Sequence, residues 1–372
     1  MTEIEIGGSK RGRIAYSFDD IALVPTRRTR NPEDVSTTWK IDAYEFNFPI
    51  MAAPMDSVVS PEVAINYGKL GGLAVLDLEG LWTRYEDPKA EFKKIISAKP
   101  ESVTEVLQQI YAQAIKPELI KERIKEIKSA GVIAAAALSP RTVVQHSKAV
   151  IEAGIDIFMI RGTTVSAEHV AKEEESLNLK KFIYELEVPV IVGGCVSQQA
   201  GLHLMRTGAA GVLVGFGGGA AHTTSDVLGI RVPMATAVAD VAAARTEYLD
   251  ESGGRYVHVI ADGSVGKSGD ISKAIAMGAD AVMMGSGLAR STTAPGNGKH
   301  WGSEAIHKDL PRGQVVDLGV VGTLEQILFG PSTSSQGALN MVGALKKAMA
   351  TTGYSDLKEL QRIEVVINAA KA

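Results

Sequence analysis

Four glycines fall within five positions, at 215 and 217–219, directly after the apolar run 211–214. A strand that runs into glycines can bring bare backbone N–H groups close to an anion, because no side chain stands in the way. Two polar residues that could take part in chemistry, His222 and Thr224, follow this glycine loop. The same glycines also suit an ordinary tight or flexible loop. The choice between the two depends on where the stretch lies in the fold.

Eight short apolar runs recur along the chain, with amphipathic helical patterns between them. The runs span 49–55, 73–78, 132–138, 155–160, 189–192, 211–215, 258–261 and 281–284. The helical patterns include 61–70, 117–129, 142–153, 198–207 and 269–277, and several of them close on a glycine that suits a helix C-cap. Eight strands joined by helical crossovers predict a (β/α)8 barrel of the TIM class. A doubly wound open sheet is the alternative, but no Gly-x-Gly-x-x-Gly follows the first run.

In such barrels the chemistry lies at the C-terminal ends of the strands. The residues that follow the runs are Asp56-Ser57, Glu79-Gly80, Ser139-Pro140, Arg161-Gly162, Gly194-Cys195, the glycine loop, Asp262-Gly263 and Gly285-Ser286. Loops after the seventh and eighth strands commonly bind phosphate through backbone amides, and Asp262-Gly263 and Gly285-Ser286 occupy those places. The glycine loop follows the sixth run and lies beside them. We therefore expect a phosphorylated ligand.

Two stretches lie outside the eight repeats. Residues 78–130 are charged and helical in pattern (91–98 and 118–128), but too short and polar for an inserted domain of ordinary size. Residues 291–319 are punctuated by Gly and Pro, which indicates a long surface loop of the kind that can form a lid, and 337–349 looks helical. We expect residues 1–372 to form a single barrel domain with an N-terminal arm and extra loops at the barrel mouth.

The composition is that of an ordinary globular enzyme. Of the 372 residues, 45% are hydrophobic and 22% charged, with a net charge of −4. The few basic clusters, at 10–13 and 27–30, indicate a solvated arm and give little support for a nucleic-acid partner. The single cysteine, Cys195, excludes an internal disulfide and a multi-cysteine metal site. With no signal peptide and no good membrane span, we expect a cytoplasmic protein without a membrane partner.

Three motifs, in barrel order, resemble the IMP dehydrogenase/GMP reductase family over nearly the whole chain. They are Phe-Asp-Asp-Ile-Ala-Leu-Val-Pro at 18–25, Asn-Phe-Pro-Ile-Met-Ala-Ala-Pro-Met-Asp-Ser-Val at 47–58, and Ile-Ala-Asp-Gly at 260–263 with Ser-Gly-Asp-Ile at 268–271, Lys-Ala at 273–274 and Met-Gly-Ser at 284–286. The chain is most similar to a short branch without the paired CBS regulatory domains, because residues 78–130 leave no room for them.

The resemblance assigns a chemical role to the glycine loop. In the family, a cysteine in a Gly-Pro-Gly-Ser-x-Cys-Thr-Thr-Arg loop attacks C2 of the purine, and hydride moves to or from a nicotinamide cofactor. Counting back from Val232-Pro233 puts His222 at the cysteine position and Thr224 at a threonine implicated in activating water or ammonia. Both are thereby candidate catalytic residues. Imidazole is a weaker nucleophile than thiolate, so a plain structural role for His222 is an equal alternative.

Other departures from the family pattern affect the same loop and its neighbours. Ala220 and Ser225 stand where the family has a phosphate-binding serine and an arginine. Cys195 lies one strand earlier, where the family usually has Asn, and suits a small, inert, half-buried side chain. Only nine residues separate Gly302 from Arg312 and they hold no Arg-Tyr pair, so the family's hydrolytic flap is missing. That absence favours reductase-like chemistry over hydrolysis.

The resemblance also implies a purine-nucleotide site and a nicotinamide cofactor. The implied substrate-binding residues are Met55, Gly217, Gly219, Asp262, Gly263, Gly285, Ser286 and Gly302, with Asp262 for the ribose hydroxyls and Gly263, Gly285 and Ser286 for phosphate. Arg312 stands where a Glu or Gln supports the base. Arg161 replaces an Asp that meets the nicotinamide ribose, a charge reversal that could favour NADP over NAD or block the cofactor.

Three functional hypotheses follow from these residues. The first is an oxidoreductase that acts on IMP or GMP with NAD or NADP. The second is a catalytically silent purine-nucleotide sensor, since binding positions are kept while chemical positions change. The third is another phosphate-handling barrel enzyme that uses His222. By resemblance we also expect a homotetramer, and a monovalent cation such as K+ at the glycine loop is left open.

Overall fold

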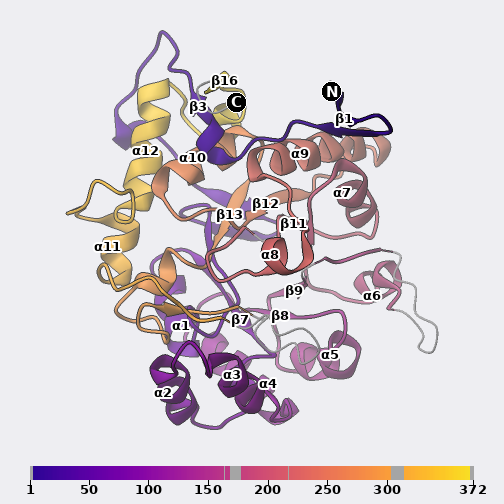
Figure 1. Ribbon diagram of the computed structural model, residues 1–372, viewed down its shortest axis with the longest axis vertical. Helices are drawn as coiled ribbons and strands as arrows, with labels where there is room; N and C mark the ends of the chain where they lie inside the picture. Colours follow the sequence, from indigo (N-terminus) through magenta and orange to yellow (C-terminus); the bar gives the residue numbers. More distant parts are fainter. Residues whose placement is uncertain (1–2, 163, 168–176, 217, 303–313, 369–372) are drawn as a thin grey trace.

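The computed structural model describes residues 3–162, 164–167, 177–216, 218–302 and 314–368. Its centre is a closed barrel of eight parallel strands in chain order, surrounded by helices (Figure 1). The strands are β6 (Ile50–Ala52), β7 (Leu73–Asp77), β8 (Ala135–Leu138), β9 (Ile157–Arg161), β10 (Val190–Cys195), β11 (Gly211–Val214), β12 (His258–Asp262) and β13 (Ala281–Met284). The predicted (β/α)8 barrel is confirmed, and β13 closes it by pairing with β6.

The barrel strands are apolar because both of their faces are buried. β8 is Ala-Ala-Ala-Leu with every residue buried, as expected where side chains pack inside the barrel and helices cover the outside. Most strand ends lie within three residues of the predicted runs. The longest extension past a predicted end is in β10, which continues through Gly193 and Gly194 to Cys195. Gly193 pairs with Arg161 of β9, a continuation that two glycines without side chains do not reveal in the sequence.

The helices around the barrel follow the amphipathic patterns and end on the expected signals. Ser60 caps α1, accepting a hydrogen bond from Val63 N at 3.0 Å, and Ser197 caps α7. The helices are α1 (Pro61–Lys69), α4 (Pro117–Ser129), α5 (Val143–Glu152), α6 (Leu179–Tyr184), α7 (Gln198–Met205), α8 (Thr224–Leu228), α9 (Met234–Glu251), α10 (Ser268–Ala276), α11 (Leu324–Phe329), α12 (Met341–Thr352) and α13 (Leu357–Leu360).

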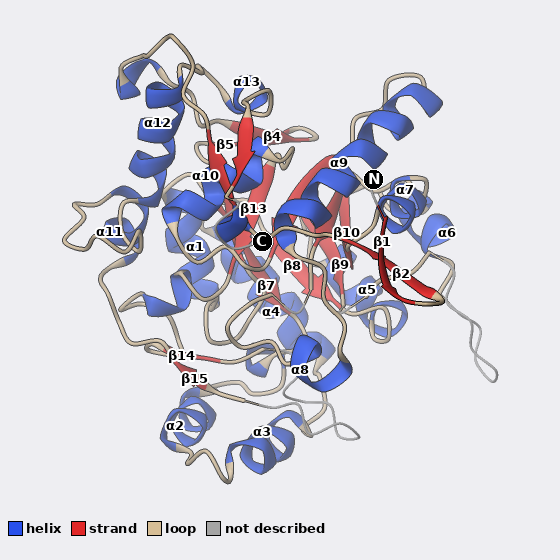
Figure 2. Ribbon diagram, turned by 45° about the horizontal axis from the view of Figure 1, so that its top comes forward, coloured by secondary structure: helices blue, strands red, loops and turns tan. Residues whose placement is uncertain are grey.

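Residues 78–130 hold α2 (Lys89–Ser97) and α3 (Val103–Tyr111) before α4. Their apolar faces form a second, smaller core, which includes Trp301 from far along the chain. The prediction of a surface loop over 291–319 is therefore wrong in part: Trp301 is only 1% exposed, and β14 (Lys299–His300) pairs with β15 (Val316–Asp317). In Figure 2 this pair lies close to α2 and α3. Buried Trp301 anchors a segment that its polar composition had predicted to be a solvent-exposed loop.

The first and last described segments of the chain pack against the rest of the molecule. The hairpin of β1 (Glu3–Gly7) and β2 (Lys10–Arg13) lies along α9, where Arg13 forms an ion pair with Asp240 at 2.6 Å (Figure 1). β3 (Ile21–Leu23) pairs with β16 (Val365–Ile367). A further hairpin, β4 (Trp39–Ile41) and β5 (Tyr44–Phe46), places fully buried Ile41 beside the start of β11.

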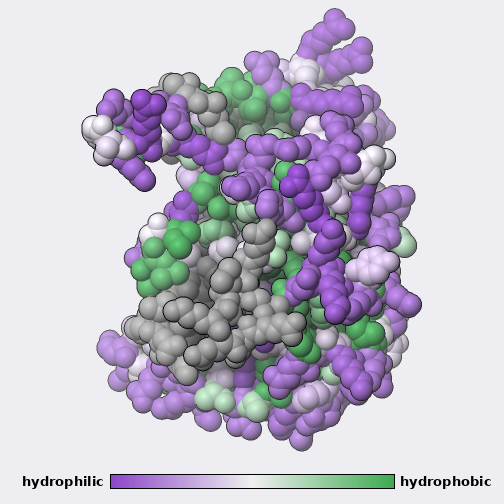
Figure 3. Space-filling model, turned by 90° about the vertical axis from the view of Figure 1, so that its right-hand side faces the viewer, coloured by the Kyte–Doolittle hydropathy of each residue, from purple (hydrophilic) through white to green (hydrophobic). Residues whose placement is uncertain are grey.

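Figure 3 shows the hydropathy of one face of the molecule. The side of the molecule that lies to the right in Figure 1 is largely hydrophilic, with hydrophobic residues gathered in separate patches (Figure 3). Among the helices that the structure describes, none combines the length and the apolar character needed to cross a membrane.

Candidate active site at the barrel mouth

The glycine loop after β11 packs tightly against the loop after β12. Gly215 has φ +118°, and a Cβ there would lie 2.3 Å from the carbonyl oxygen of Asp262. Ser264 Oγ donates a hydrogen bond to Gly218 O at 3.0 Å, and a Cβ on Gly218 would lie 2.3 Å from that Oγ. Loop-to-loop contact therefore requires glycine at both positions. Gly217 lies outside the described residues.

The glycine loop also determines where His222 lies. The His222 N–H donates to Gly219 O at 3.1 Å, and a Cβ on Gly219 would lie 2.7 Å from His222 Cδ2. The imidazole thus folds back over a glycine and remains partly exposed. Thr224 is the first residue of α8 and is fully buried. Of the two candidate catalytic residues, His222 is the one open to a ligand.

Cys195 is unsuited to replace the missing cysteine nucleophile. It is the last residue of β10, fully buried rather than half-buried, and its thiol donates to Leu213 O at 3.4 Å. Burial raises the pKa of the Cys195 thiol to about 12. Because the thiolate is the reactive form, this residue is inert at neutral pH.

Arg161 and Asp262 lie at the ends of β9 and β12 and form an ion pair across the barrel mouth. Arg161 Nε lies 3.2 Å from Asp262 Oδ2, and each side chain is 12% exposed. The residue expected to meet the cofactor and the residue expected to bind the ribose are therefore in direct contact. A partly buried pair of this kind holds its partners in place, because removing one leaves the other charge poorly solvated.

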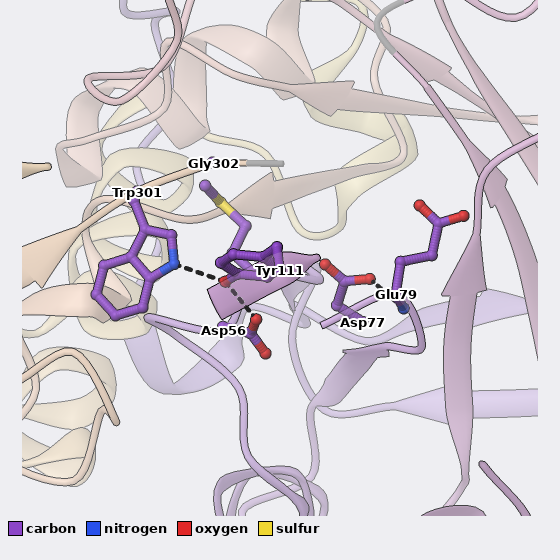
Figure 4. A pocket seen from close by; sticks show the side chains of 7 residues that line it. Asp56, Asp77, Glu79, Tyr111, Trp301 and Gly302 are labelled. Carbon is purple, nitrogen blue, oxygen red and sulfur yellow. Dashed lines mark hydrogen bonds between the residues drawn. The ribbon is translucent and has the colours of Figure 1, made fainter. Parts of the chain in front are cut away.

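A pocket opens beside these residues, at the ends of β6 and β7. It is lined by Met55, Asp56, Asp77, Glu79, Tyr111, Trp301 and Gly302 (Figure 4). Met55 and Gly302 were expected at a ligand site from the sequence, and the structure brings them together. Trp301 and Gly302 resemble the family's residues that contact the base, whereas Asp77 and Tyr111 were not expected to act there. Tyr111 gave no signal, because it comes from α3, outside the strand-and-helix repeat.

Asp56 is the most deeply buried acid of the pocket. Its Oδ2 accepts hydrogen bonds from the Tyr111 hydroxyl at 2.6 Å and from Leu81 N at 2.9 Å. Tyr111 in turn accepts from Trp301 Nε1 at 2.9 Å (Figure 4). The other oxygen, Oδ1, is buried and has no hydrogen-bond partner. Burial raises the pKa of Asp56 to about 6, against the opposing effect of these hydrogen bonds.

Asp77 and Glu79 complete the acidic side of the pocket. Glu79 Oε1 accepts hydrogen bonds from Ser139 N at 3.1 Å and Ser139 Oγ at 2.6 Å, and from the Thr142 hydroxyl. Burial and the nearby charges of Asp56 and Glu79 hold the pKa of Asp77 well above its usual range. Asp77 therefore holds its proton more tightly than an ordinary carboxyl group, and in the protonated form it can donate a hydrogen bond.

His300, which the sequence reasoning missed, joins the site from β14. Its Nδ1 lies 2.9 Å from Ser57 Oγ, and only 2% of the residue is exposed. A Cβ on Gly285 would lie 3.0 Å from Met55 Sδ and 3.3 Å from His300 Cε1. Met55, Gly285 and His300 are thus neighbours. A lone histidine in a polar segment gives no indication in the sequence that it lies at the site. Its partner Ser57 was predicted there, because it follows the first strand.

The remaining predicted residues are distributed around the same mouth. Gly263 follows β12 with φ +107°, and Ser286 follows Gly285 after β13. The backbone N–H groups of Gly266 and Lys267, farther along the loop after β12, donate to Asp270. Ser303 and Arg312 lie outside the described residues.

The chain is similar to several known proteins over almost its full length. It is 49% identical to an uncharacterized oxidoreductase of Mycolicibacterium smegmatis, over 98% of this chain and 100% of that protein. It is 27% identical to the inosine-5'-monophosphate dehydrogenase of Methanocaldococcus jannaschii, over 93% of this chain and 91% of that protein. A crystal structure of an IMP dehydrogenase/GMP reductase-like protein from Corynebacterium glutamicum superposes with a TM-score of 0.94, at 48% identity and 98% coverage of both chains.

A family model described as the IMP dehydrogenase / GMP reductase domain matches residues 15–372. Together with the closed barrel and the arrangement at its mouth, this match shows that the chain belongs to the IMP dehydrogenase/GMP reductase family of oxidoreductases.

Proposed function

We propose that this protein is a purine-nucleotide oxidoreductase that acts at C2 of IMP or GMP with NAD or NADP. The observation that carries the proposal is the convergence of one set of residues at the barrel mouth. His222 folds over the glycine loop, Asp262 ends β12, and Gly285 follows β13 against Met55. These positions could hold a ring, a ribose and a phosphate in one ligand. Family membership supports the purine nucleotide as that ligand.

Each residue has a distinct task in this proposal. Asp262 would accept hydrogen bonds from ribose hydroxyls while Arg161 holds its carboxylate in position. The backbone at Gly263, Gly285 and Ser286 would take the phosphate. His222, at the position of the family's cysteine, would act on the ring, either as a nucleophile or in proton transfer.

The pocket residues fit the nicotinamide cofactor that the family implies. A carboxamide both donates and accepts hydrogen bonds. The unpartnered Oδ1 of Asp56 is an acceptor, and Asp77, whose pKa is raised, is a donor when it carries its proton. Arg161 adds a cation that suits the extra phosphate of NADP. When bound, the cofactor supplies the hydride acceptor or donor. The chain's own contribution is to orient it, and to bind K+ if the glycine loop takes a monovalent cation.

A catalytically silent, nucleotide-binding regulatory protein is the second candidate. It is favoured by one observation: the glycine loop carries His222 in place of a thiol, and the sole cysteine is buried with a pKa of about 12. Such a protein would bind IMP or GMP without changing it.

Two measurements on the same purified protein separate these candidates. The first follows nicotinamide absorbance with IMP plus NAD or NADP, and with GMP plus NADH or NADPH, in K+ and in Na+ buffers. The second measures thermal shifts with each nucleotide. Turnover that His222→Ala abolishes supports the oxidoreductase. Stabilisation by IMP or GMP without turnover supports the regulatory protein, and no stabilisation by any purine nucleotide contradicts both.

A further inference from the structure

His300 lies beside the residues that follow β6 and β13 at the barrel mouth. Its Cε1–Nε2 edge faces Gly285 after β13, since a Cβ on Gly285 would lie 3.3 Å from Cε1 and 3.4 Å from Nε2. Met55, after β6, lies on the same side. His222, after β11, is close enough to influence the charge of His300. The imidazole therefore borders the proposed nucleotide site from a segment that is not a barrel strand.

The ring is fixed by Ser57 on its opposite edge. Ser57 Oγ lies 2.9 Å from His300 Nδ1 and 3.4 Å from both the N–H and the carbonyl oxygen of Trp301. The Trp301 N–H can only donate, so Ser57 Oγ already serves it as an acceptor. The serine proton is then free to go to Nδ1 or to the Trp301 carbonyl, and the Nδ1 contact is the shorter by 0.5 Å. We therefore assign the serine proton to Nδ1, which forms the shorter of the two contacts.

This arrangement fixes the tautomer of the neutral ring. A ring nitrogen that accepts a hydrogen bond carries no proton, so the proton of neutral His300 is on Nε2. Burial, and secondarily the charge that His222 can carry, lower the pKa of His300 to about 4. At neutral pH His300 is therefore an uncharged donor whose N–H edge borders Gly285 and Met55.

A neutral donor in this place suits a neutral oxygen. A phosphate would favour the protonated, charged imidazole, whereas the surroundings of His300 suppress protonation. The adjacent thioether of Met55 suits contact with a flat ring. A purine that carries a carbonyl oxygen at C6 offers both a ring face and an uncharged acceptor, whereas a purine that carries an amino group at C6 offers a donor there.

We propose that His300 is a specificity-determining residue, which donates its Nε2–H to the C6 carbonyl oxygen of a 6-oxopurine nucleotide and thereby rejects 6-aminopurines. The inference rests on the proposed function, because it assigns a group that recognises the base in that same site. Ser57 acts through His300 as a positioning residue. A site built to satisfy a donor discriminates strongly, since the wrong base leaves two donors facing each other without an acceptor.

The test compares the affinities of IMP and AMP for the full-length protein by calorimetric titration. We expect wild type to prefer IMP, and His300→Ala to reduce the ratio of the two affinities about tenfold, chiefly by weakening IMP. His300→Gln carries an amide N–H near the place of Nε2 and should restore most of the preference. Ser57→Ala removes the group that fixes the tautomer and should give an intermediate ratio.

A matched control is His258→Gln, a histidine partly buried at the opposite end of the barrel beside Asp280. It can alter stability but should leave the ratio of affinities unchanged. The nitrogen-15 NMR spectrum of the protein, which has seven histidines, reports the tautomer directly. A signal pair for His300 with the proton on Nδ1 contradicts the inference.

The outcomes separate the inference from the proposed function. If IMP and GMP bind wild type but His300→Ala leaves the IMP-to-AMP ratio unchanged, the role of His300 is wrong and the proposed function stands. If no purine nucleotide binds wild type, both are wrong. The His300→Gln variant gives a second check. If it is folded and its IMP-to-AMP affinity ratio is no higher than that of His300→Ala, donation from Nε2 is contradicted.

Discussion

At the residue scale, the proposed chemistry depends on His222, which the resemblance puts at the position of the family's cysteine in the glycine loop. His222 is partly exposed and held by its own backbone bond to Gly219, so a side chain at 222 is presented to the site by the loop itself. Thiolate attacks carbon far better than imidazole, and cysteine is smaller than histidine. Replacing His222 by cysteine therefore tests whether the other residues of the site can support turnover of the nucleotide.

We predict that His222→Cys increases turnover of IMP with NAD(P), or of GMP with NAD(P)H, by about tenfold or more, because a thiol is the better nucleophile. Initial rates from nicotinamide absorbance measure the gain, and His222→Ser is the control of similar size. A His222→Cys protein that binds nucleotide as wild type does, yet remains as inactive as the serine variant, points to the regulatory role.

Asp56 makes a pH-dependent contribution to stability whose sign follows from its raised pKa. The folded-state pKa of about 6 lies above the ordinary value of 3.8, so the folded state holds the proton more tightly. Stability from this group is complete below pH 4 and is lost as pH rises through 6. A shift of about two units corresponds to about 3 kcal/mol.

We predict that Asp56→Asn removes this dependence. The amide oxygen can accept from both Tyr111 and Leu81, and no ionisation remains. Relative to wild type, the free energy of unfolding of the variant should improve by about 2 to 3 kcal/mol between pH 4 and pH 7.5. Urea unfolding at the two pH values measures it. An equal difference at both values shows that Asp56 keeps an ordinary pKa.

At the scale of elements, one buried carboxylate connects several segments at the N-terminal end of the barrel. Asp280, 2% exposed, accepts hydrogen bonds from Arg245 of α9 at 3.0 Å, from Tyr256 at 2.8 Å and from the backbone of Val259 in β12 at 2.9 Å. Lys358 of α13 also binds it. Burial alone would raise the pKa of Asp280, but Arg245 and Lys358 lower it on balance. Its contribution to stability is therefore present at neutral pH and is lost as pH falls through the lowered pKa.

We predict that Asp280→Ala lowers the free energy of unfolding at pH 7 by about 3 kcal/mol or more, because it leaves the charge of Arg245 partly buried without its carboxylate partner. Asp317→Ala is the control, since the Asp317 side chain is exposed and its ion pair with Lys299 is screened by solvent, so its loss should change the free energy of unfolding little. Urea unfolding compares them. Similar losses in the two variants contradict a special role for Asp280.

The elements show what sequence patterns can and cannot predict. Runs such as 281–284 and the helix 117–129 were predicted to the residue, because period and caps are local properties. The strand-end rule placed Asp56, Arg161 and Asp262 at one mouth, since topology alone brings them there. Tyr111 and His300 could not be placed, because they reach the site through contacts that no local pattern encodes.

At the scale of the whole molecule, the polar surface carries an exposed N-terminal hairpin with apolar side chains. Ile6 is 72% exposed, and Ile4 and Ile14 are 45% and 53% exposed. Apolar groups of this kind gathered on one projection suit contact with another chain. In the homotetramer that the resemblance leads us to expect, these isoleucines could contact a neighbouring subunit.

We predict a homotetramer in solution, with a mass about four times the 39.4 kDa of one chain. Light scattering coupled to size exclusion measures it. If the hairpin takes part in assembly, Ile6→Lys lowers the mass, whereas the exposed Tyr184→Ser on α6 serves as a surface control. A monomeric wild type contradicts the expectation.

The burial of Cys195 has a consequence for how the protein withstands oxidants and electrophiles. A family member that relies on an accessible thiolate can be inactivated by alkylation or by peroxide, because the same low pKa that activates sulfur exposes it to damage. Here the only thiol is fully buried and protonated. We predict that iodoacetamide or peroxide leaves Cys195 unmodified, as measured by mass spectrometry, until the chain unfolds. The affinity for nucleotide should also stay unchanged. The protein should therefore keep its nucleotide-binding or catalytic function under oxidising or alkylating conditions that inactivate an enzyme with an accessible catalytic thiol.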